Sequence, residues 1–569
     1  MMASQINGSE ILIKTLIDEG VDTVYGYPGG AIMPVFDALY TYSDKINHVL
    51  VRHEQAAAHA AQGFARVSGR TGVVIVTSGP AATNLVTGLS DALMDSTPLV
   101  VIAGQVVSPM LGTDAFQEID VIGVTQAVTK WSYQIRRVED ISWAVARAFY
   151  IANSGRPGPV MLDLTKDAQV ALAEYNYSKC TFIRSYNPDP SLIDSQITKA
   201  AEMINQAEKP LLLLGQGVVI SGAEQELKEL VEKADIPVGL TLLGLSALPT
   251  AHRLNMGMVG MHGHVAPNIK TNECDVLIAV GMRFDDRVTC NLDKYARQAK
   301  IIHFDIDPSE FNKNVAVDVE VIGDAKKSLA AVLKEVNEAK HTEWVDSFKV
   351  CLEAETQKVI QPEVYPTEGD LNMGEVVRKV SEATQNKAIL VTDVGQNQMH
   401  GARYFNFTET RSMVTSGGLG TMGFGLPAAI GAKMGAPERE VCLFTGDGGI
   451  QMTIEELGAI MQYNIAVKII ILNNNFLGMV RQWQELFFDA RYSQTVMVNP
   501  NFAALAAAYN IPARNVDSRE ELNEAIEEML ACKGAYLLNV NVCEKGMVFP
   551  MIPVGHGVAE IMLNSTDKY

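Results

Sequence analysis

The sequence predicts an α/β protein with three domains, each built on a doubly wound parallel sheet. The chain has 569 residues, too many for one hydrophobic core, and a division into about three domains of roughly 150–200 residues follows. Short apolar runs typical of buried strands alternate with helical patterns along the whole chain, an order that predicts parallel sheets. Two proline-bearing segments, 186–190 and 360–366, are typical of linkers. The expected domains are residues 1–185, 190–355 and 366–569.

The first unit opens with an amphipathic helix over residues 8–17. An alanine-rich helix is expected later, over residues 55–66. Strands are expected at residues 47–51, 73–77, 99–103 and 161–164, with turn clusters at 27–30, 78–80 and 155–159. This alternation predicts the first parallel sheet.

The same alternation runs through the other two units. In the middle unit, strands are expected at residues 211–214, 237–240, 276–280 and 301–305. In the third unit they are expected at residues 388–392, 441–444, 467–472 and 536–541. Thr453-Ile-Glu-Glu456 has the pattern of a capping box and predicts a helix that runs to about Gln462.

Composition and charge narrow the class of protein. Hydrophobic residues make up 47% of the chain and charged residues 20%, so a large core is available. The net charge of −20 argues against nucleic acid or an anionic membrane surface as a partner. No apolar run approaches the ~18 residues that span a bilayer. The seven cysteines include no C-x-x-C pair and fit a reducing compartment. A cytoplasmic protein that binds neither nucleic acid nor membrane is expected.

The stretch from Val441 to Asn475 contains the most informative local pattern. Asp447 and Asn474 each fall just beyond an expected strand, and the carboxyl ends of parallel strands face one crevice. A carboxylate and a carboxamide oxygen beside several glycines suit Mg²⁺, which fills its remaining positions with phosphate oxygens and water. A plain strand–helix–strand unit with a Gly-Asp-Gly turn explains the local sequence equally well.

The motif Gly446-Asp-Gly448, followed by Asn473-Asn474, resembles the thiamin-diphosphate motif, including the step of 27 residues from Asp447 to Asn474. Three longer segments, 283–289, 415–429 and 473–483, resemble the catalytic subunits of the acetohydroxyacid synthase (acetolactate synthase) family. The resemblance covers nearly the whole chain. It implies two thiamin-diphosphate-binding domains that flank a Rossmann-like middle domain, which binds FAD.

The resemblance also implies the reaction, the cofactors and the assembly. The expected enzyme, a transferase, decarboxylates pyruvate on thiamin diphosphate and ligates the hydroxyethyl unit to a second 2-keto acid. The product is 2-acetolactate from pyruvate or 2-aceto-2-hydroxybutyrate from 2-ketobutyrate, for branched-chain amino-acid biosynthesis. The expected cofactors are thiamin diphosphate, Mg²⁺ and FAD. A homodimer or a dimer of dimers with shared active sites is implied, together with a small regulatory subunit.

In the first domain, the resemblance assigns Glu54 as the acid that relays a proton to the aminopyrimidine of thiamin diphosphate. Taken alone, a glutamate in the first turn of a helix is more often an exposed side chain whose negative charge interacts favourably with the helix dipole. The resemblance also places at the active site Gly30, Phe116, Gln117 and Lys166, although a lone lysine after a strand is usually a solvated charge.

In the middle domain, Gly281-Met-Arg-Phe-Asp-Asp-Arg-Val288 is the segment typical of the flavin-containing branch of the family. Without the resemblance, its arginines and aspartates would more often form a surface ion-pair cluster. Arg287 is expected to bind the substrate carboxylate. The residues expected to contact FAD are Arg156, Gly215, Gln216, Gly217, Thr241, Leu242, Met261, His262, Gly281, Arg283, Asp285, Asp305, Ile306 and Asp324. The pair His262-x-His264 is too sparse to indicate a metal site.

In the third domain, the resemblance implies that Asp447, Asn474 and the carbonyl of Phe476 ligate Mg²⁺. Met422 is expected to wedge between the rings of the coenzyme, and Trp483 to line the pocket for the second keto acid. Met479 is expected to take part in catalysis. The cofactor-binding residues expected here are Val394, Gly395, Gln396, Asn397, Gly420, Met422, Gly446, Asp447, Gly448, Gly449, Asn474, Phe476, Leu477, Gly478, Met479 and Val480. The tail segment 548–553 is expected to close over the site.

Three other functions are compatible with parts of this pattern. A pyruvate oxidase would use the flavin as an electron acceptor and consume oxygen. A flavin oxidoreductase would need the Asp447–Asn474 region only as structure. A non-catalytic regulatory binder would tolerate loss of Glu54.

Overall fold

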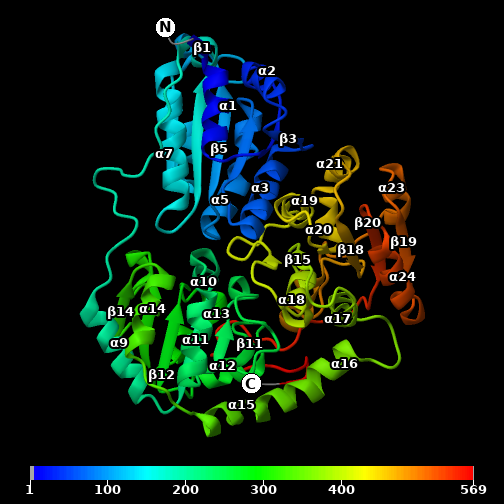
Figure 1. Ribbon diagram of the computed structural model, residues 1–569. Coiled ribbons are helices and arrows are strands. Elements are labelled where there is room, and N and C mark those ends of the chain that lie inside the picture. Colours follow the sequence, from blue (N-terminus) through cyan, green and yellow to red (C-terminus); the bar gives the residue numbers. More distant parts are fainter. Residues whose placement is uncertain (1–4, 568–569) are drawn as a thin grey trace.

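The computed structural model describes residues 5–567, and it arranges them as three α/β bodies around a common centre (Figure 1). Each body holds a six-stranded sheet, and every strand pair within these three sheets is parallel. The predicted fold class, three parallel-sheet α/β domains, is confirmed. Among residues 5–567, none of the helices combines the length and the hydropathy that crossing a membrane requires.

The first body has its sheet in the order β3-β2-β4-β5-β7-β6. Its strands are β2 (Thr23–Tyr27), β3 (Asn47–Leu50), β4 (Gly72–Val76), β5 (Leu99–Gln105), β6 (Trp131–Ile135) and β7 (Pro159–Thr165). Its helices are α1 (Gly8–Asp18), α2 (Met33–Thr41), α3 (Glu54–Ser68), α4 (Pro80–Thr83), α5 (Val86–Met94), α6 (Val121–Thr125), α7 (Ile141–Asn153) and α8 (Lys166–Val170). A separate antiparallel pair joins β1 (Gln5–Asn7) to β8 (Leu172–Glu174).

The middle body has the strand order β11-β10-β9-β12-β13-β14, which is the 3-2-1-4-5-6 order of dinucleotide-binding sheets. Its strands are β9 (Pro210–Leu214), β10 (Val238–Leu240), β11 (Asn255–Met258), β12 (Val276–Val280), β13 (Lys300–Asp305) and β14 (Val319–Ile322). Its helices are α9 (Asp194–Gln206), α10 (Gln216–Ser221), α11 (Glu224–Ala234), α12 (Val265–Thr271), α13 (Asp286–Thr289), α14 (Ala325–Glu335) and α15 (Thr342–Glu355). The expected linker 360–366 is helical through α16 (Gln361–Val364).

The third body has the strand order β16-β15-β17-β18-β20-β19, so its strands follow the same relative order as those of the first body. Its strands are β15 (Ile389–Thr392), β16 (Met413–Val414), β17 (Val441–Gly446), β18 (Lys468–Asn473), β19 (Ala513–Val516) and β20 (Tyr536–Asn541). Its helices are α17 (Met373–Ala383), α18 (Gln396–Tyr404), α19 (Gly425–Gly435), α20 (Asp447–Gln451), α21 (Leu457–Tyr463), α22 (Gly478–Phe487), α23 (Phe502–Ala508) and α24 (Arg519–Ala531). Two similar sheets therefore flank a dinucleotide-type sheet, as expected.

The predicted capping box at Thr453 is wrong. The Thr453 hydroxyl donates to the carbonyl of Gly423 at 2.9 Å, and it caps no helix. A short 3₁₀ turn, Ile454–Glu456, precedes α21 instead. The Glu456 carboxylate accepts the backbone N–H groups of Arg52 and His53 in the first body, at 2.7 and 3.0 Å. Thr453 and Glu456 therefore form hydrogen bonds with residues outside this helix instead of the two capping-box hydrogen bonds.

The first and third bodies pack closely where α3 meets α19, which lie side by side in Figure 1. An added Cβ on Gly431 would lie 1.7 Å from the carbonyl oxygen of Ala60, and one on Gly63 would lie 2.0 Å from that of Ala428. The two helix backbones therefore approach as closely as glycine allows.

Replacing Gly431 by alanine is expected to destabilise the protein by about 1–3 kcal/mol, because the helices must separate to admit the methyl group. The matched control is Gly534→Ala, where the added Cβ meets only Asn464 Oδ1, at 3.6 Å. Thermal unfolding followed by circular dichroism compares the two variants. Equal midpoints for both would contradict the close approach of α3 and α19.

Candidate active site

Asp447 and Asn474 lie next to each other at the carboxyl edge of the third sheet. Strands β17 and β18 pair in register from Cys442–Lys468 to Gly446–Leu472, and each residue follows the end of its strand. Both side chains are buried. Asp447 Oδ2 accepts a hydrogen bond from Asn499 Nδ2 at 2.7 Å, and Asn474 Nδ2 donates to Gln396 Oε1 at 3.0 Å. The two oxygen-bearing groups are thus held in place by amides.

No cationic side chain among residues 5–567 forms an ion pair with the Asp447 carboxylate. Burial raises its pKa to about 6, and the hydrogen bonds from Asn499 and from nearby backbone N–H groups oppose that shift only in part. A buried carboxylate of this kind is completed by a metal ion better than by water. Among residues 5–567 there is no cluster of three or more His, Cys, Asp or Glu side chains that could hold a metal. A Mg²⁺ site here would combine one carboxylate with an amide and a carbonyl oxygen.

The residues predicted for the diphosphate surround an open space next to this edge. Gly395 and Gly420 have φ of +125° and +70°, and an added Cβ on Gly420 would meet only Val394 Cγ1, at 3.9 Å. An added Cβ on Gly446 would meet only the Asn397 amide nitrogen, at 3.4 Å. Asn397 is buried, and its Oδ1 finds no hydrogen-bond partner among the residues that the structure describes. A cradle of bare backbone with an unsatisfied amide fits an elongated polar ligand.

Met422, Leu477 and Gly478 pack around the same edge. An added Cβ on Gly448 would lie 2.6 Å from Leu477 Cδ2 and 3.8 Å from Met422 Cε. An added Cβ on Gly478 would lie 2.1 Å from Gln396 Oε1. A side chain at either glycine would therefore displace a side chain of another predicted cofactor-binding residue, Leu477 or Gln396.

Asp393 is a residue of this site that the sequence analysis missed. Its fully buried carboxylate accepts the backbone N–H groups of Val394 at 2.8 Å, of Gly423 at 3.0 Å and of Gly425 at 3.0 Å. Burial raises its pKa, and these N–H groups oppose the rise. The carboxylate fastens the diphosphate cradle to the turn that carries Met422. Its position directly after β15 was the available signal.

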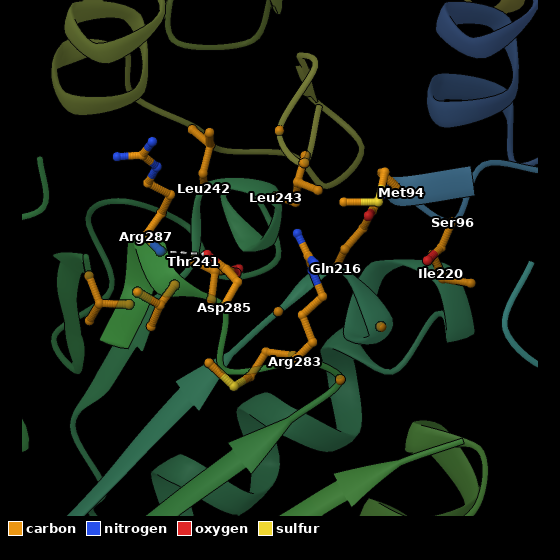
Figure 2. A pocket seen from close by; sticks show the side chains of 18 of the residues that line it. Met94, Ser96, Gln216, Ile220, Thr241, Leu242, Leu243, Arg283, Asp285 and Arg287 are labelled. Carbon is orange, nitrogen blue, oxygen red and sulfur yellow. Dashed lines mark hydrogen bonds between the residues drawn. The ribbon is translucent and has the colours of Figure 1, made fainter. Parts of the chain in front are cut away.

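A cavity of about 650 Å³ lies where the three bodies meet. Figure 2 shows side chains of the middle body together with Met94 and Ser96 of the first body around it. All the residues predicted to contact FAD line this cavity: Arg156, Gly215, Gln216, Gly217, Thr241, Leu242, Met261, His262, Gly281, Arg283, Asp285, Asp305, Ile306 and Asp324. The cavity continues to Val394, Gly395, Gly420, Met479 and Trp483. It therefore reaches the edge of the diphosphate cradle.

The walls of the cavity fit a dinucleotide. The backbones of the loops after β9 and β12 are in contact. An added Cβ on Gly217 would lie only 2.6 Å from Gly281 Cα. Asp305 is the last residue of β13, and burial raises its pKa to about 7. A carboxylate at the carboxyl edge of the sheet can accept hydrogen bonds from hydroxyl groups of a ligand. Arg283 projects into the cavity in Figure 2, whereas Arg156 forms ion pairs with Glu310 at 2.8 Å and Asp307 at 3.7 Å.

The predicted substrate-binding residues lie at the open end of this region. Arg287 is exposed, and its guanidinium lies 3.4 Å from Met261 Sδ. Trp483 contacts Phe487 on α22, with ring centroids 5.5 Å apart. Met479, Val480 and Trp483 also line a second, apolar cavity of about 590 Å³.

The predicted first-domain residues gather at the carboxyl edge of the first sheet. Lys166 Nζ donates to the carbonyl of Gly30 at 3.1 Å, and Asn84 Nδ2 donates to Glu54 Oε2 at 2.9 Å. Glu54 is half-buried at the start of α3. Gln117 adopts a left-handed φ of 59°, and Phe116 is 88% exposed. Of the residues that line the central cavity, none belongs to this group. The first-domain group therefore stands apart from the cavity that reaches Val394, Gly395 and Gly420.

Comparison with known proteins identifies relatives of all three bodies. Sequence models described as "Thiamine pyrophosphate enzyme" match the N-terminal TPP binding domain at residues 6–124, the central domain at 197–332 and the C-terminal TPP binding domain at 393–540. "Acetolactate synthase isozyme 3 large subunit" of Escherichia coli is 42% identical over 571 residues, which cover 99% of each chain. "Acetolactate synthase large subunit" of Lactococcus lactis is 43% identical, with 99% of this chain and 97% of the relative covered. "Probable acetolactate synthase large subunit" of Methanocaldococcus jannaschii is 44% identical, with 98% and 95% covered.

Proposed function

This chain belongs to the family of acetolactate synthase large subunits, and from that premise we propose that it is a thiamin-diphosphate-dependent carboligase. It decarboxylates pyruvate and ligates the resulting two-carbon unit to a second 2-keto acid in valine, leucine and isoleucine biosynthesis. The product is 2-acetolactate, or 2-aceto-2-hydroxybutyrate when the second acid is 2-ketobutyrate. The observation that carries this proposal is the buried Asp447–Asn474 pair at the carboxyl edge of the third sheet, within a match over the full length of the relatives.

We propose that Asp447, Asn474 and the carbonyl of Phe476 hold Mg²⁺. Burial disfavours the charged form of the Asp447 side chain, and the positive charge of Mg²⁺ would compensate for that cost. The cradle of Val394, Gly395, Gln396 and Asn397 would hold the diphosphate. Glycine loops with bare N–H groups are suited to that task. When bound, the thiamin coenzyme supplies the electron sink for decarboxylation.

Glu54 is the proposed acid that activates the coenzyme from the first domain. Its Oε2 is held by the Asn84 amide, so its other oxygen can hold a proton directed at the ligand. Gly30, Phe116, Gln117 and Lys166 form the proposed remainder of this half. Lys166 Nζ holds the turn at Gly30 through its carbonyl, which fixes the backbone at the point of approach.

We propose that the central cavity binds FAD. Its support is the dinucleotide-type strand order, the contact between Gly217 and Gly281, and the acidic Asp305 at the carboxyl end of β13. At the open end, Arg287 would bind the carboxylate of the keto acid with its guanidinium fork, while Met479 and Trp483 shape the apolar side of the pocket.

We propose that two chains share their active sites in a homodimer or a dimer of dimers. The support is twofold. The first-domain group does not line the cavity of its own chain among residues 5–567. Large apolar side chains beside both halves are exposed, among them Met33 at 52%, Phe116 at 88%, Val480 at 52% and Val498 at 95%. A second copy would cover them and would complete each site with its own Glu54.

Further proposals concern the partner, the compartment and the domain limits. Because the relatives are named large subunits, we propose that a small regulatory subunit binds this chain. A cytoplasmic location is proposed because all seven cysteines stand as free thiols. The proposed domains are residues 1–185, 190–355 and 366–569.

The decisive assay measures acetolactate from pyruvate with thiamin diphosphate, Mg²⁺ and FAD each omitted in turn. The proposal predicts product without oxygen, and loss of product when thiamin diphosphate or Mg²⁺ is absent. Oxygen uptake coupled to pyruvate, without acetolactate, would identify a pyruvate oxidase instead. Product formation that does not depend on Mg²⁺ would contradict the assignment of Asp447 and Asn474 as ligands of Mg²⁺.

Substituting alanine for Gly217 is expected to weaken flavin binding by about tenfold or more, because the methyl group pushes apart the two loops that approach the ligand. Titration of the flavin-free protein with FAD, followed by flavin fluorescence, measures the dissociation constant. Gly534→Ala serves as the glycine-to-alanine control. An unchanged dissociation constant in the Gly217→Ala variant would move the flavin site elsewhere.

A further inference from the structure

The segment Thr415–Thr421, here named the glycine loop, belongs to the third body but is held largely by the first. Its residues Ser416 to Gly420 line the central cavity, and Met422 follows it directly. The loop therefore forms a wall of the proposed flavin site and carries a residue of the proposed thiamin site. The contacts that fix the shape of this loop therefore affect the binding of both flavin and thiamin diphosphate.

Asp95 provides the first attachment. Its carboxylate accepts the backbone N–H of Gly417 at 2.9 Å and that of Gly418 at 2.7 Å. It also accepts Arg66 Nη2 at 2.7 Å. Asp95 is 1% exposed, and an added Cβ on Gly418 would lie 2.8 Å from its Oδ1. All three partners of Asp95 are donors, so only a carboxylate satisfies them.

Asp91, one helical turn earlier on α5, provides the second attachment. Its Oδ2 accepts the hydroxyl groups of Ser416 at 2.6 Å and Thr421 at 2.5 Å, which tie together the two ends of the loop. Its Oδ1 has no hydrogen-bond partner in the described part of the chain, and Arg66 Nη2 lies 4.0 Å from it. Burial and the neighbouring charge of Asp95 raise the pKa of Asp91. Asp91 is therefore bonded to the glycine loop through Oδ2.

The same end of α5 also forms the wall of the cavity that adjoins the loop, because an added Cβ on Gly418 would lie 3.0 Å from Met94 Cβ. Met94 and Ser96, on either side of Asp95, line the cavity and are labelled in Figure 2. Arg156 fastens them through hydrogen bonds to Met94 O at 3.4 Å and Ser96 Oγ at 2.8 Å. Arg66 completes the connection by donating to the carbonyl of Thr415. One buried cluster thus joins walls contributed by two domains.

We propose that Asp91 and Asp95 are positioning residues that hold the glycine loop in the shape that binds flavin and supports Met422. This inference rests on the proposed function, because it assumes that the cavity is the flavin site. Neither carboxylate lines the cavity. They act on the ligands through the loop, from a different domain of the same chain.

The chemistry of the partners makes an asymmetric prediction for the two isosteric variants. In Asp95→Asn, the amide NH₂ must take the place of an oxygen that accepts a loop N–H, so a hydrogen bond to the loop is lost and two donors face each other. In Asp91→Asn, the amide oxygen can replace Oδ2, and the NH₂ takes the place of an oxygen that has no partner. The first change should release the loop, whereas the second should leave it in place.

The experiment titrates flavin-free wild type, Asp95→Asn, Asp91→Asn and Asp91→Ala with FAD and records flavin fluorescence and thermal midpoint. Asp95→Asn and Asp91→Ala are expected to raise the FAD dissociation constant by about tenfold or more, whereas Asp91→Asn stays near wild type. At saturating FAD and thiamin diphosphate, kcat should return close to wild type, because the loop positions ligands without touching the reacting groups. Asp235→Asn is the matched control: Asp235 is buried, paired with Arg253 and bonded to the His341 N–H, and lies outside the cavity.

The outcomes separate this inference from the function on which it rests. Wild type that takes up no FAD would refute the flavin site and this inference with it. Wild type that binds FAD, together with an unchanged dissociation constant in Asp95→Asn, would overturn the inference alone. Flavin loss in Asp235→Asn equal to that in Asp95→Asn would also overturn it, because general destabilisation would then explain both. If Asp95→Asn does not fold, the contrast between Asp91→Asn and Asp91→Ala decides, and equal affinities in those two variants contradict the inference.

Discussion

Replacing Asp447 by asparagine is expected to lower acetolactate formation by about 10³-fold or more at ordinary Mg²⁺ concentrations. The substitution keeps the size of the side chain and removes the charge that Mg²⁺ needs. Asparagine at this position can still meet Asn499 Nδ2 with its amide oxygen, so the local fold should survive. The loss should therefore appear in metal and coenzyme binding, with little change in thermal midpoint.

The control for this variant is Glu455→Gln, a carboxylate-to-amide change nearby in the sequence on a half-buried side chain with no assigned role. Calorimetric titration with thiamin diphosphate at fixed Mg²⁺ measures binding directly. If Asp447→Asn binds the coenzyme as tightly as wild type and keeps its activity, the Asp447–Asn474 edge is structural and the metal site is wrong.

Replacing Glu54 by glutamine is expected to lower kcat by about 10²–10⁴-fold, the usual contribution of a positioned acid or base. Glutamine can still accept the hydrogen bond from Asn84 Nδ2, but it cannot exchange a proton. Affinity for thiamin diphosphate should change little, because the proposed diphosphate and metal sites lie in the third domain. Steady-state kinetics of pyruvate turnover, combined with coenzyme titration, separates kcat from binding.

The alternative role of Glu54 predicts a different result. If Glu54 only complements the dipole of α3, glutamine should cost about 0.3–1 kcal/mol of stability and leave kcat unchanged. A lowered unfolding midpoint with normal kcat would therefore remove Glu54 from the mechanism.

The central strands were predictable because they are buried on both faces. β12, Val276–Val280, is buried at every position and is an uninterrupted apolar run in the sequence. The missed strands include short ones at sheet edges, such as β16, Met413–Val414, and β19, Ala513–Val516. β19 is half-exposed over most of its length, so its sequence mixes polar and apolar residues without a clear period.

The parts of the site that lie in local motifs were also predictable. Asp447 and Asn474 follow strands that the sequence marks clearly, and parallel pairing then places them together. The segment Gly281–Val288, proposed to bind flavin, was recognised through its resemblance to the family, because its arginines and aspartates alone indicated a surface ion-pair cluster. Asp447 and Asn474 were found because strand ends and glycine turns leave a local pattern.

The supporting residues could not be found in this way. Asp393, Asp95 and Glu456 act by accepting backbone N–H groups from distant segments, and any residue type can supply such a donor. Glu456 also explains the wrong helix cap, since its carboxylate is occupied by the first domain. Which donors come within reach depends on how the three domains pack, and that information is not local in the sequence.

The most direct test of the account mixes the Glu54→Gln and Asp447→Asn proteins, each inactive alone, under conditions that exchange subunits. If the thiamin site takes Glu54 from one chain and Asp447 from the other, each mixed dimer contains one intact site. Random exchange of equal amounts makes about half of the dimers mixed, so about a quarter of wild-type activity should return. Mixed dimers that form, shown by differential tags, and remain inactive would contradict a site shared between chains.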